Sequence, residues 1–290
     1  MTNKRTEAKR LVIFLLLAFG ITWLPTIILN KTIGYHEWFE TYKIPVFSWI
    51  VGFGPALANV ITRKLTREGW HDSLLHFNFK GNLKYYLIAV FTVSVLGIFQ
   101  GILATLTIGG GDWSDWGKDL NLAQTLSTFF TLFATAPLMA FNTFGEEFGW
   151  RGYMNQKMEP LLGTTGTIIV GGILWGLWHA PLTVEGHNFG TDYPGYPYVG
   201  MLCMCVNCTF MGIILMWLTK RTNSIYPAAI FHAMNNFGGT FTISLFVSGV
   251  PEGYEPTVPQ QLMLDIPLYI AALIIFTLML QSGRTRASGK

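Results

Sequence analysis

Charged residues are scarce in this sequence of 290 residues: Asp, Glu, Lys and Arg together make up 12%, while 51% of the residues are hydrophobic. The mean hydropathy of +0.40 agrees with that scarcity. Such a composition argues against a soluble domain and indicates an integral membrane protein. No stretch rich in Ser, Pro or Gly is long enough to divide the chain. We therefore expect one integral-membrane domain over residues 1–290.

Two further absences narrow the function. No basic stripe with interleaved aromatic residues is present, so the sequence implies no nucleic-acid partner. The cysteines, Cys203, Cys205 and Cys208, fall inside one apolar segment and lie too close on one helix to form a disulfide. We expect them to be small packing residues.

About eight apolar segments are long enough to cross a hydrocarbon core as helices. We therefore expect an all-α, polytopic bundle of transmembrane helices. The segments are approximately 11–29, 45–62, 84–108, 120–147, 163–184, 196–219, 224–248 and 262–281.

The distribution of charge predicts the topology. With eight spans both termini lie on one side, and that side holds all Lys and Arg residues except Lys31, Lys43 and Lys118. By the positive-inside rule, we expect cytoplasmic termini and a multi-pass protein of the cell membrane. The stretch 63–83, which would be cytoplasmic, has the pattern of a basic amphipathic segment lying on the surface of the lipid bilayer.

Two adjacent carboxylates and a guanidinium interrupt the apolar pattern: residues 146–151 read Glu-Glu-Phe-Gly-Trp-Arg. A charge inside a membrane-like stretch costs free energy, so it must be paired with an opposite charge or serve a function. These groups are therefore candidate functional residues. Glu147 and Arg151 have the spacing at which helix side chains meet, and we expect them to pair. Glu146 points roughly 100° away around the helix and stays free for chemistry.

Imidazoles interrupt two later apolar segments. His179 ends the run Trp175-Gly176-Leu177-Trp178-His179, and His232 and Asn236 lie one helical turn apart on one face of another segment. A lone histidine in a soluble core is usually structural, whereas a histidine within a membrane favours a functional role.

The distances of these side chains from the cytoplasmic ends of their helices predict that they lie at one level in the membrane. If the helix that carries Glu146 continues to about residue 158 and the next begins near 164, Glu146 lies roughly 18 Å before the turn and His179 roughly 22 Å after it. His232 and Asn236 lie roughly 12 and 18 Å from the start of their helix, at the same membrane face. We expect these side chains at one level, reached from the cytoplasmic side.

In this order, the patterns Glu-Glu-x-x-x-Arg, aromatic-x-x-x-His and His-x-x-x-Asn resemble the motifs of the CPBP family of intramembrane proteases. That family includes type II CAAX prenyl proteases and bacteriocin-processing or self-immunity proteins. The resemblance covers roughly residues 120–245, which would form the catalytic core. One departure is Trp175, because the family pattern usually has Phe there.

The resemblance implies hydrolysis of a peptide bond within the membrane. Carried over by motif, Glu146 would be the general base that activates water, and His179 would hold or polarise that water. His232 and Asn236 would stabilise the oxyanion, while Glu147 and Arg151 brace the helix. The substrate would be a peptide or protein, either a prenylated C-terminal CAAX peptide or a leader or membrane-protein segment.

The chemistry of the residues agrees with this reading. Water is a poor nucleophile at neutral pH and needs a base, and a tetrahedral intermediate needs donors for its oxyanion. Neither a Ser-His-Asp arrangement nor an H-E-x-x-H motif is present, so activated water is favoured over a covalent nucleophile. The metal question stays open: Glu146, His179 and His232 have the donor types of a His₂Glu zinc site, yet the same residues can work without a divalent metal.

Two other classes of function compete with a protease. A catalytically silent immunity or interaction protein would keep the fold without needing the full set of polar groups. A proton-coupled transporter could use Glu146 and the histidines as a relay, but inverted repeats, which such proteins often show, are not detectable in the sequence.

The topology can be tested with two cysteine variants in intact cells. We expect a membrane-impermeant maleimide to label Lys118→Cys at once, but Lys80→Cys only after the cells are permeabilised. The unmodified protein gives the background from its own cysteines. Labelling of Lys80→Cys in intact cells would contradict both the cytoplasmic position of residues 63–83 and access to the site from the cytoplasm.

Overall fold

The structure, a computed structural model, describes residues 3–42, 51–118, 121–237, 243 and 245–288, and its regular elements there are all helices. The expected all-α architecture is confirmed for this part of the chain. The elements are α1 (Lys4–Thr32), α2 (Tyr35–Tyr42), α3 (Gly54–Thr66), α4 (Leu83–Thr107), α5 (Leu122–Gly149), the π-helical turn η2 (Trp150–Met154), α6 (Asn155–Trp178), α7 (Ala180–Thr183), α8 (Tyr198–Thr222), α9 (Tyr226–Phe237), α11 (Val258–Leu264) and α12 (Ile266–Ser288).

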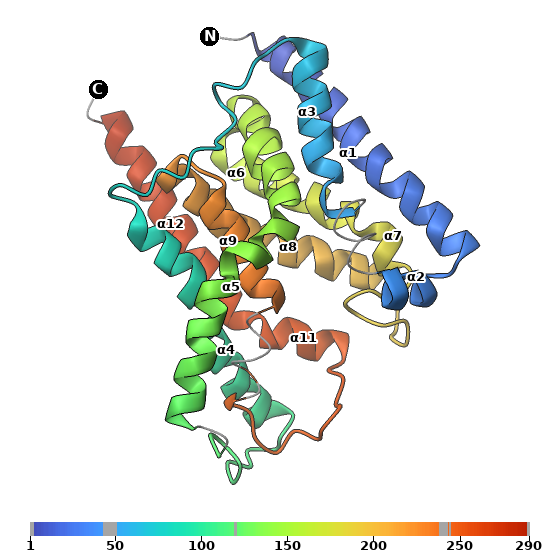
Figure 1. Cartoon of the computed structure of the whole chain (residues 1–290), viewed down its shortest axis with the longest axis vertical. Helices are drawn as coiled ribbons and strands as arrows, with labels where there is room; N and C mark the ends of the chain where they lie inside the picture. Colours follow the sequence, from blue (N-terminus) through green and yellow to red (C-terminus); the bar gives the residue numbers. More distant parts are fainter. Residues whose placement is uncertain (1–2, 43–50, 119–120, 238–242, 244, 289–290) are drawn as a thin grey trace.

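The structure contains several helices that could cross a membrane. In the part described, four are long and apolar enough, and α11 with α12, bent by 47°, would make a fifth. The expected spans 45–62 and 224–248 lie partly outside the described residues. Both chain ends lie at one end of the molecule (Figure 1), as the predicted topology requires. Eight spans and cytoplasmic termini nevertheless remain predictions.

Helix α8 lies at the centre of the bundle and packs against α6, α9 and α12, while α1 and α3 run side by side along one flank (Figure 1). Leu215 and Leu218 of α8 are fully buried. By contrast, Leu16, Phe130 and Leu138 are 71%, 72% and 75% exposed. Apolar side chains that face outward on several helices are suited to a lipid environment.

Two glycines set the distance between α6 and α8. A Cβ atom added at Gly172 would lie 2.4 Å from the Cα of Thr209, and one added at Gly176 would lie 2.4 Å from the Cα of Cys205. Any larger residue would force the helices apart, as in other close helix contacts built on small residues.

The polypeptide reverses direction at Gly163, inside the segment assigned to α6. Gly163 has φ 69° and ψ 175°, which no helix contains. A Cβ atom added at Gly171 would lie 3.3 Å from the Oδ1 of Asn155 and 4.0 Å from the Sδ of Met158. A straight helix would separate residues 155 and 171 by roughly 24 Å. The two arms of α6 therefore run antiparallel, with the turn close to where the sequence predicted it.

Part of the stretch 63–83, which we expected to lie on the surface of the bilayer, is tied to the protein by ion pairs. Arg63 is buried and pairs with Asp72, and Lys157 of α6 lies 2.7 Å from Glu68. Burial raises the pKa of Glu68, but the hydrogen bonds from Lys157 and Tyr153 and the charges of Lys157 and Arg10 together hold it below its usual value. These charges neutralise one another across distant parts of the chain, while Lys64, Arg67 and His71 are exposed, so the surface position of the segment remains a prediction.

The turn at Gly163 gives a prediction about stability. Only glycine adopts this backbone region without strain, and a Cβ there would have no neighbour within 4 Å. Gly163→Ala should therefore cost about 1–3 kcal/mol through the backbone alone and lower the thermal midpoint in detergent.

The matched control is Gly20→Ala in the middle of α1, where a Cβ also has no neighbour within 4 Å. Alanine favours helix over glycine, so this variant should keep or raise the midpoint. An unchanged midpoint for Gly163→Ala would count against the turn.

Candidate active site

The two carboxylates lie at the end of α5, and Arg151 lies in the π-helical turn that follows. Arg151 donates from a terminal guanidinium nitrogen to the Oε1 of Glu147 at 3.1 Å, and the side chains are 4% and 0% exposed. The expected pair is therefore present and fully buried. In such a place either partner alone would be an uncompensated charge, so the two residues depend on each other.

Glu147 also fixes an imidazole from α9. Its Oε1 lies 2.9 Å from the Nδ1 of His232. A carboxylate can only accept, so Nδ1 carries the hydrogen. In the neutral ring the Nε2 of His232 is then an acceptor, and in the imidazolium it becomes a second donor. One oxygen atom of Glu147 thus links α9 to the end of α5.

Trp175 of α6 lies between the charged groups. Its indole Nε1–H donates to the Oε2 of Glu146 at 2.8 Å, and the guanidinium carbon of Arg151 lies 4.0 Å from its ring centroid. The ring also meets the imidazole of His232 edge-on, with centroids 5.3 Å apart. Glu146 itself is buried. Trp175 therefore contacts groups from both α5 and α9.

His179 lies where α6 ends and the short helix α7 begins. Its Nδ1 is 2.9 Å from the carbonyl oxygen of Trp175. A carbonyl only accepts, so Nδ1 carries the hydrogen and the Nε2 of the neutral ring keeps its lone pair. The side chain is half-buried, which leaves His179 more accessible than Glu146.

Helix α1 stabilises this break between α6 and α7. The indole of Trp23 donates to the carbonyl of Trp178 at 2.9 Å, and the amide of Asn30 donates to the carbonyl of Pro181 at 2.8 Å. Carbonyl groups left free where a helix breaks need such partners inside a membrane. Neither Trp23 nor Asn30 carried a signal in the sequence, because their partners lie about 150 residues away.

Asn236 lies apart from the other candidates. It is exposed, and its Oδ1 accepts a hydrogen bond of 3.5 Å from Asn235. No hydrogen bond joins it to Glu146, His179 or His232, which are all within the described chain. The structure thus brings five of the six predicted site residues together around Trp175 and leaves Asn236 one turn beyond His232.

The three candidate metal ligands, Glu146, His179 and His232, do not form a metal cluster in this arrangement. Over the described ranges, no three His, Cys, Asp or Glu side chains are placed to hold a metal ion. Trp175 and Glu147 engage the Oε2 of Glu146 and the Nδ1 of His232, which leaves the Oε1 of Glu146 and the Nε2 of each histidine as the atoms that could reach a metal. We therefore derive no step that passes through a metal, and the zinc hypothesis remains a prediction.

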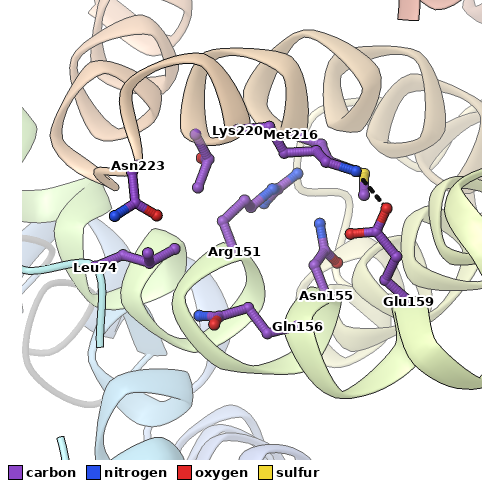
Figure 2. A pocket seen from close by; sticks show the side chains of 9 residues that line it. Leu74, Arg151, Asn155, Gln156, Glu159, Met216, Lys220 and Asn223 are labelled. Atoms are coloured by element: carbon purple, nitrogen blue, oxygen red, sulfur yellow. Dashed lines mark hydrogen bonds and ion pairs between the residues drawn. The ribbon is translucent and has the colours of Figure 1, made fainter. Parts of the chain in front are cut away.

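A cavity of about 150 Å³ lies beside Arg151 (Figure 2). Arg151 projects into it, and an ion pair between Lys220 and Glu159 lies at its edge. None of the reacting groups lines it. The lining residues are Leu74, Arg151, Asn155, Gln156, Glu159, Met216, Thr219, Lys220 and Asn223.

The region that contains the candidate site residues is similar to a known protein family. Residues 127–238 match the sequence model of a family described as "Type II CAAX prenyl endopeptidase Rce1-like". The family resemblance is confirmed. The Rce1-like segment begins within α5 and ends after α9, so it contains every residue of the three motifs.

Individual relatives are similar over part of the chain. The chain is 33% identical to "CAAX prenyl protease 2" of Methanococcus maripaludis over 92 residues, which are 31% of this chain and 34% of that protein. It is 33% identical to "Lysostaphin resistance protein A" of Staphylococcus haemolyticus over 110 residues, 37% of this chain and 26% of that protein. The protein of that name from Staphylococcus epidermidis is 30% identical over 148 residues, 49% of this chain and 35% of that protein. The chain thus matches about a third of the length of these relatives.

The pairing of Glu147 and Arg151 gives a prediction about stability. Arg151→Gln leaves the buried Glu147 charge without its main partner and should cost about 3–5 kcal/mol. The double variant Glu147→Gln, Arg151→Gln removes both charges. Its thermal midpoint in detergent should fall by less than the sum of the two single losses, and strictly additive losses would contradict the coupling.

Proposed function

We propose that this protein is an intramembrane endopeptidase in which Glu146 activates the water that hydrolyses a peptide bond. The observation that carries the proposal is the arrangement around Trp175. A buried carboxylate and two imidazoles, from segments far apart in the sequence, contact this residue, and each imidazole is held through Nδ1. General acid–base hydrolysis needs groups of these types in fixed positions.

Water activation is assigned to Glu146 and His179. The Nε2 of His179 accepts a hydrogen bond from the attacking water and orients it. Glu146 takes the other proton of that water as the oxygen attacks the scissile carbonyl carbon. Because Oε2 of Glu146 is engaged by Trp175, the proton goes to Oε1.

Stabilisation of the oxyanion is assigned to His232, with Asn236 as a second donor. As an imidazolium, His232 presents Nε2–H to the oxyanion, while its Nδ1–H stays on Glu147. Arg151 keeps Glu147 in place. Asn236 donates its amide hydrogen from the accessible side.

Breakdown of the tetrahedral intermediate completes the reaction. The carbon–nitrogen bond breaks, and the proton held by Glu146 passes to the departing nitrogen. The immediate products are a carboxylic acid and an amine, the acid passes its proton to the amine to give a carboxylate and an ammonium group, and Glu146 is ionised again. No covalent bond to the protein forms at any stage.

The substrate class is part of the proposal. The matched relatives are named a CAAX prenyl protease and lysostaphin resistance proteins. We propose that the substrate is a peptide or protein segment reached from the cytoplasmic face, either a prenylated C-terminus or a leader or membrane segment. A cell-membrane location agrees with the apolar helices.

Cleavage of a panel of quenched peptides by the purified protein in detergent tests the proposal. The panel contains prenylated and unmodified C-termini. We expect Glu146→Gln to lower the cleavage rate by at least about 10²-fold, because the general base is lost. The matched control is Glu252→Gln, the same substitution at an exposed loop position, which should cleave like the original protein.

Three results would redirect the interpretation. Unchanged cleavage by Glu146→Gln would exclude Glu146 as the base. Loss of activity with a chelator, restored by zinc, would move the mechanism to a metal-dependent one. If no peptide is cleaved by the original protein, the competing role of a silent membrane partner gains support.

A further inference from the structure

Trp175 is unusual among the buried tryptophans of this site. The indole nitrogens of Trp150 and Trp178 are equally buried, and neither has a hydrogen-bond partner among the residues described. Only Trp175 of these three donates, and it donates to the proposed base. Burial in this bundle therefore does not by itself give an indole N–H a partner, so the bond to Glu146 calls for a functional explanation.

We propose that Trp175 is a positioning residue for the reaction, an inference that rests on the proposed function. Its indole N–H holds Oε2 of Glu146 and so turns Oε1 towards the attacking water. Its backbone carbonyl holds the Nδ1–H of His179 at 2.9 Å, which keeps the Nε2 of that ring free to accept. One residue thus orients both groups that handle the water.

The size of the indole also matters. Its ring lies under the guanidinium of Arg151 and against the imidazole of His232, so Trp175 cannot move far without disturbing both. A residue locked by packing can hold a hydrogen bond at fixed geometry, which is what a positioned base requires. A phenylalanine, the usual residue in the family motif, would keep much of this packing but has no N–H to donate.

Trp175→Phe separates the two roles of the residue. The variant loses the bond to Glu146 but keeps an aromatic ring and the backbone carbonyl. A hydrogen bond to a charged group supports an expected fall in kcat of about tenfold. KM should change by less than about twofold, because in our mechanism the indole contacts the base and not the peptide.

Trp150→Phe is the matched control. It makes the same change at a fully buried indole whose nitrogen has no hydrogen-bond partner in the described structure. We expect its kcat to stay within about twofold of the original value. If the control loses as much kcat as Trp175→Phe, the effect is one of packing and the positioning role is wrong. The same holds if Trp175→Phe raises KM and leaves kcat unchanged.

A second measurement does not depend on a substrate. In protein labelled with [15N]tryptophan, the indole N–H resonance of Trp175 is assigned by its loss in Trp175→Phe. Glu146→Ala removes the acceptor, and we expect this resonance to move upfield while those of Trp150 and Trp178 keep their positions. An unmoved Trp175 resonance would overturn the proposal.

The two experiments distinguish failure of the inference from failure of the proposed function. If Glu146→Gln is inactive and Trp175→Phe keeps full kcat, the inference fails and the peptidase stands. If the resonance moves but Glu146→Gln cleaves peptides normally, the hydrogen bond exists while Glu146 is not the base, and both assignments fall.

Discussion

A carboxylate with no exposed surface has to be neutralised where it lies, and Glu147 is such a group. Its Oε1 receives one hydrogen bond from Arg151 and another from His232. A lone buried charge would destabilise the fold by several kcal/mol. Arg151 and His232 are therefore kept in position by the same free energy that keeps the Glu147 carboxylate paired. The orientation of His232 and the packing of Arg151 over Trp175 both follow from this requirement. The positions of the site residues therefore depend on the charge of Glu147, although Glu147 takes no part in the proposed chemical steps.

Several of these features could be predicted because they depend on local spacing. The pair of Glu147 with Arg151 follows from the helical repeat, and the extents of α4, α5 and α8 follow closely from runs of apolar residues. The reversal near Gly163 was needed to bring Glu146 and His179 to one depth, and the structure has it there. The contacts of Trp175 with Glu146 and His232 agree with that depth argument.

Other features depend on which side chains meet across the bundle, and no periodic pattern reports that. The sequence predicted Glu146 at the level of the histidines and Glu147 paired with Arg151, and only the packing of α9 on α5 decides that His232 meets Glu147. The bond from Trp175 to Glu146 depends similarly on the side-chain conformation of one indole. The ion pairs of the stretch after α3 could not be predicted, because Lys157, which pairs with Glu68, lies 89 positions later in the sequence.

The exposure of the proposed site residues differs, which indicates the side from which a substrate would enter. Asn236 is exposed, His179 is half-buried, and Glu146 and His232 are buried. A peptide that enters from the Asn236 side would meet the second oxyanion donor first and the base last. The cavity beside Arg151 is lined by none of these groups, so a peptide entering there would meet the supporting charges instead. Because the Glu147–Arg151 pair is buried, it can hold its position while the more exposed groups, His179 and Asn236, receive water and substrate.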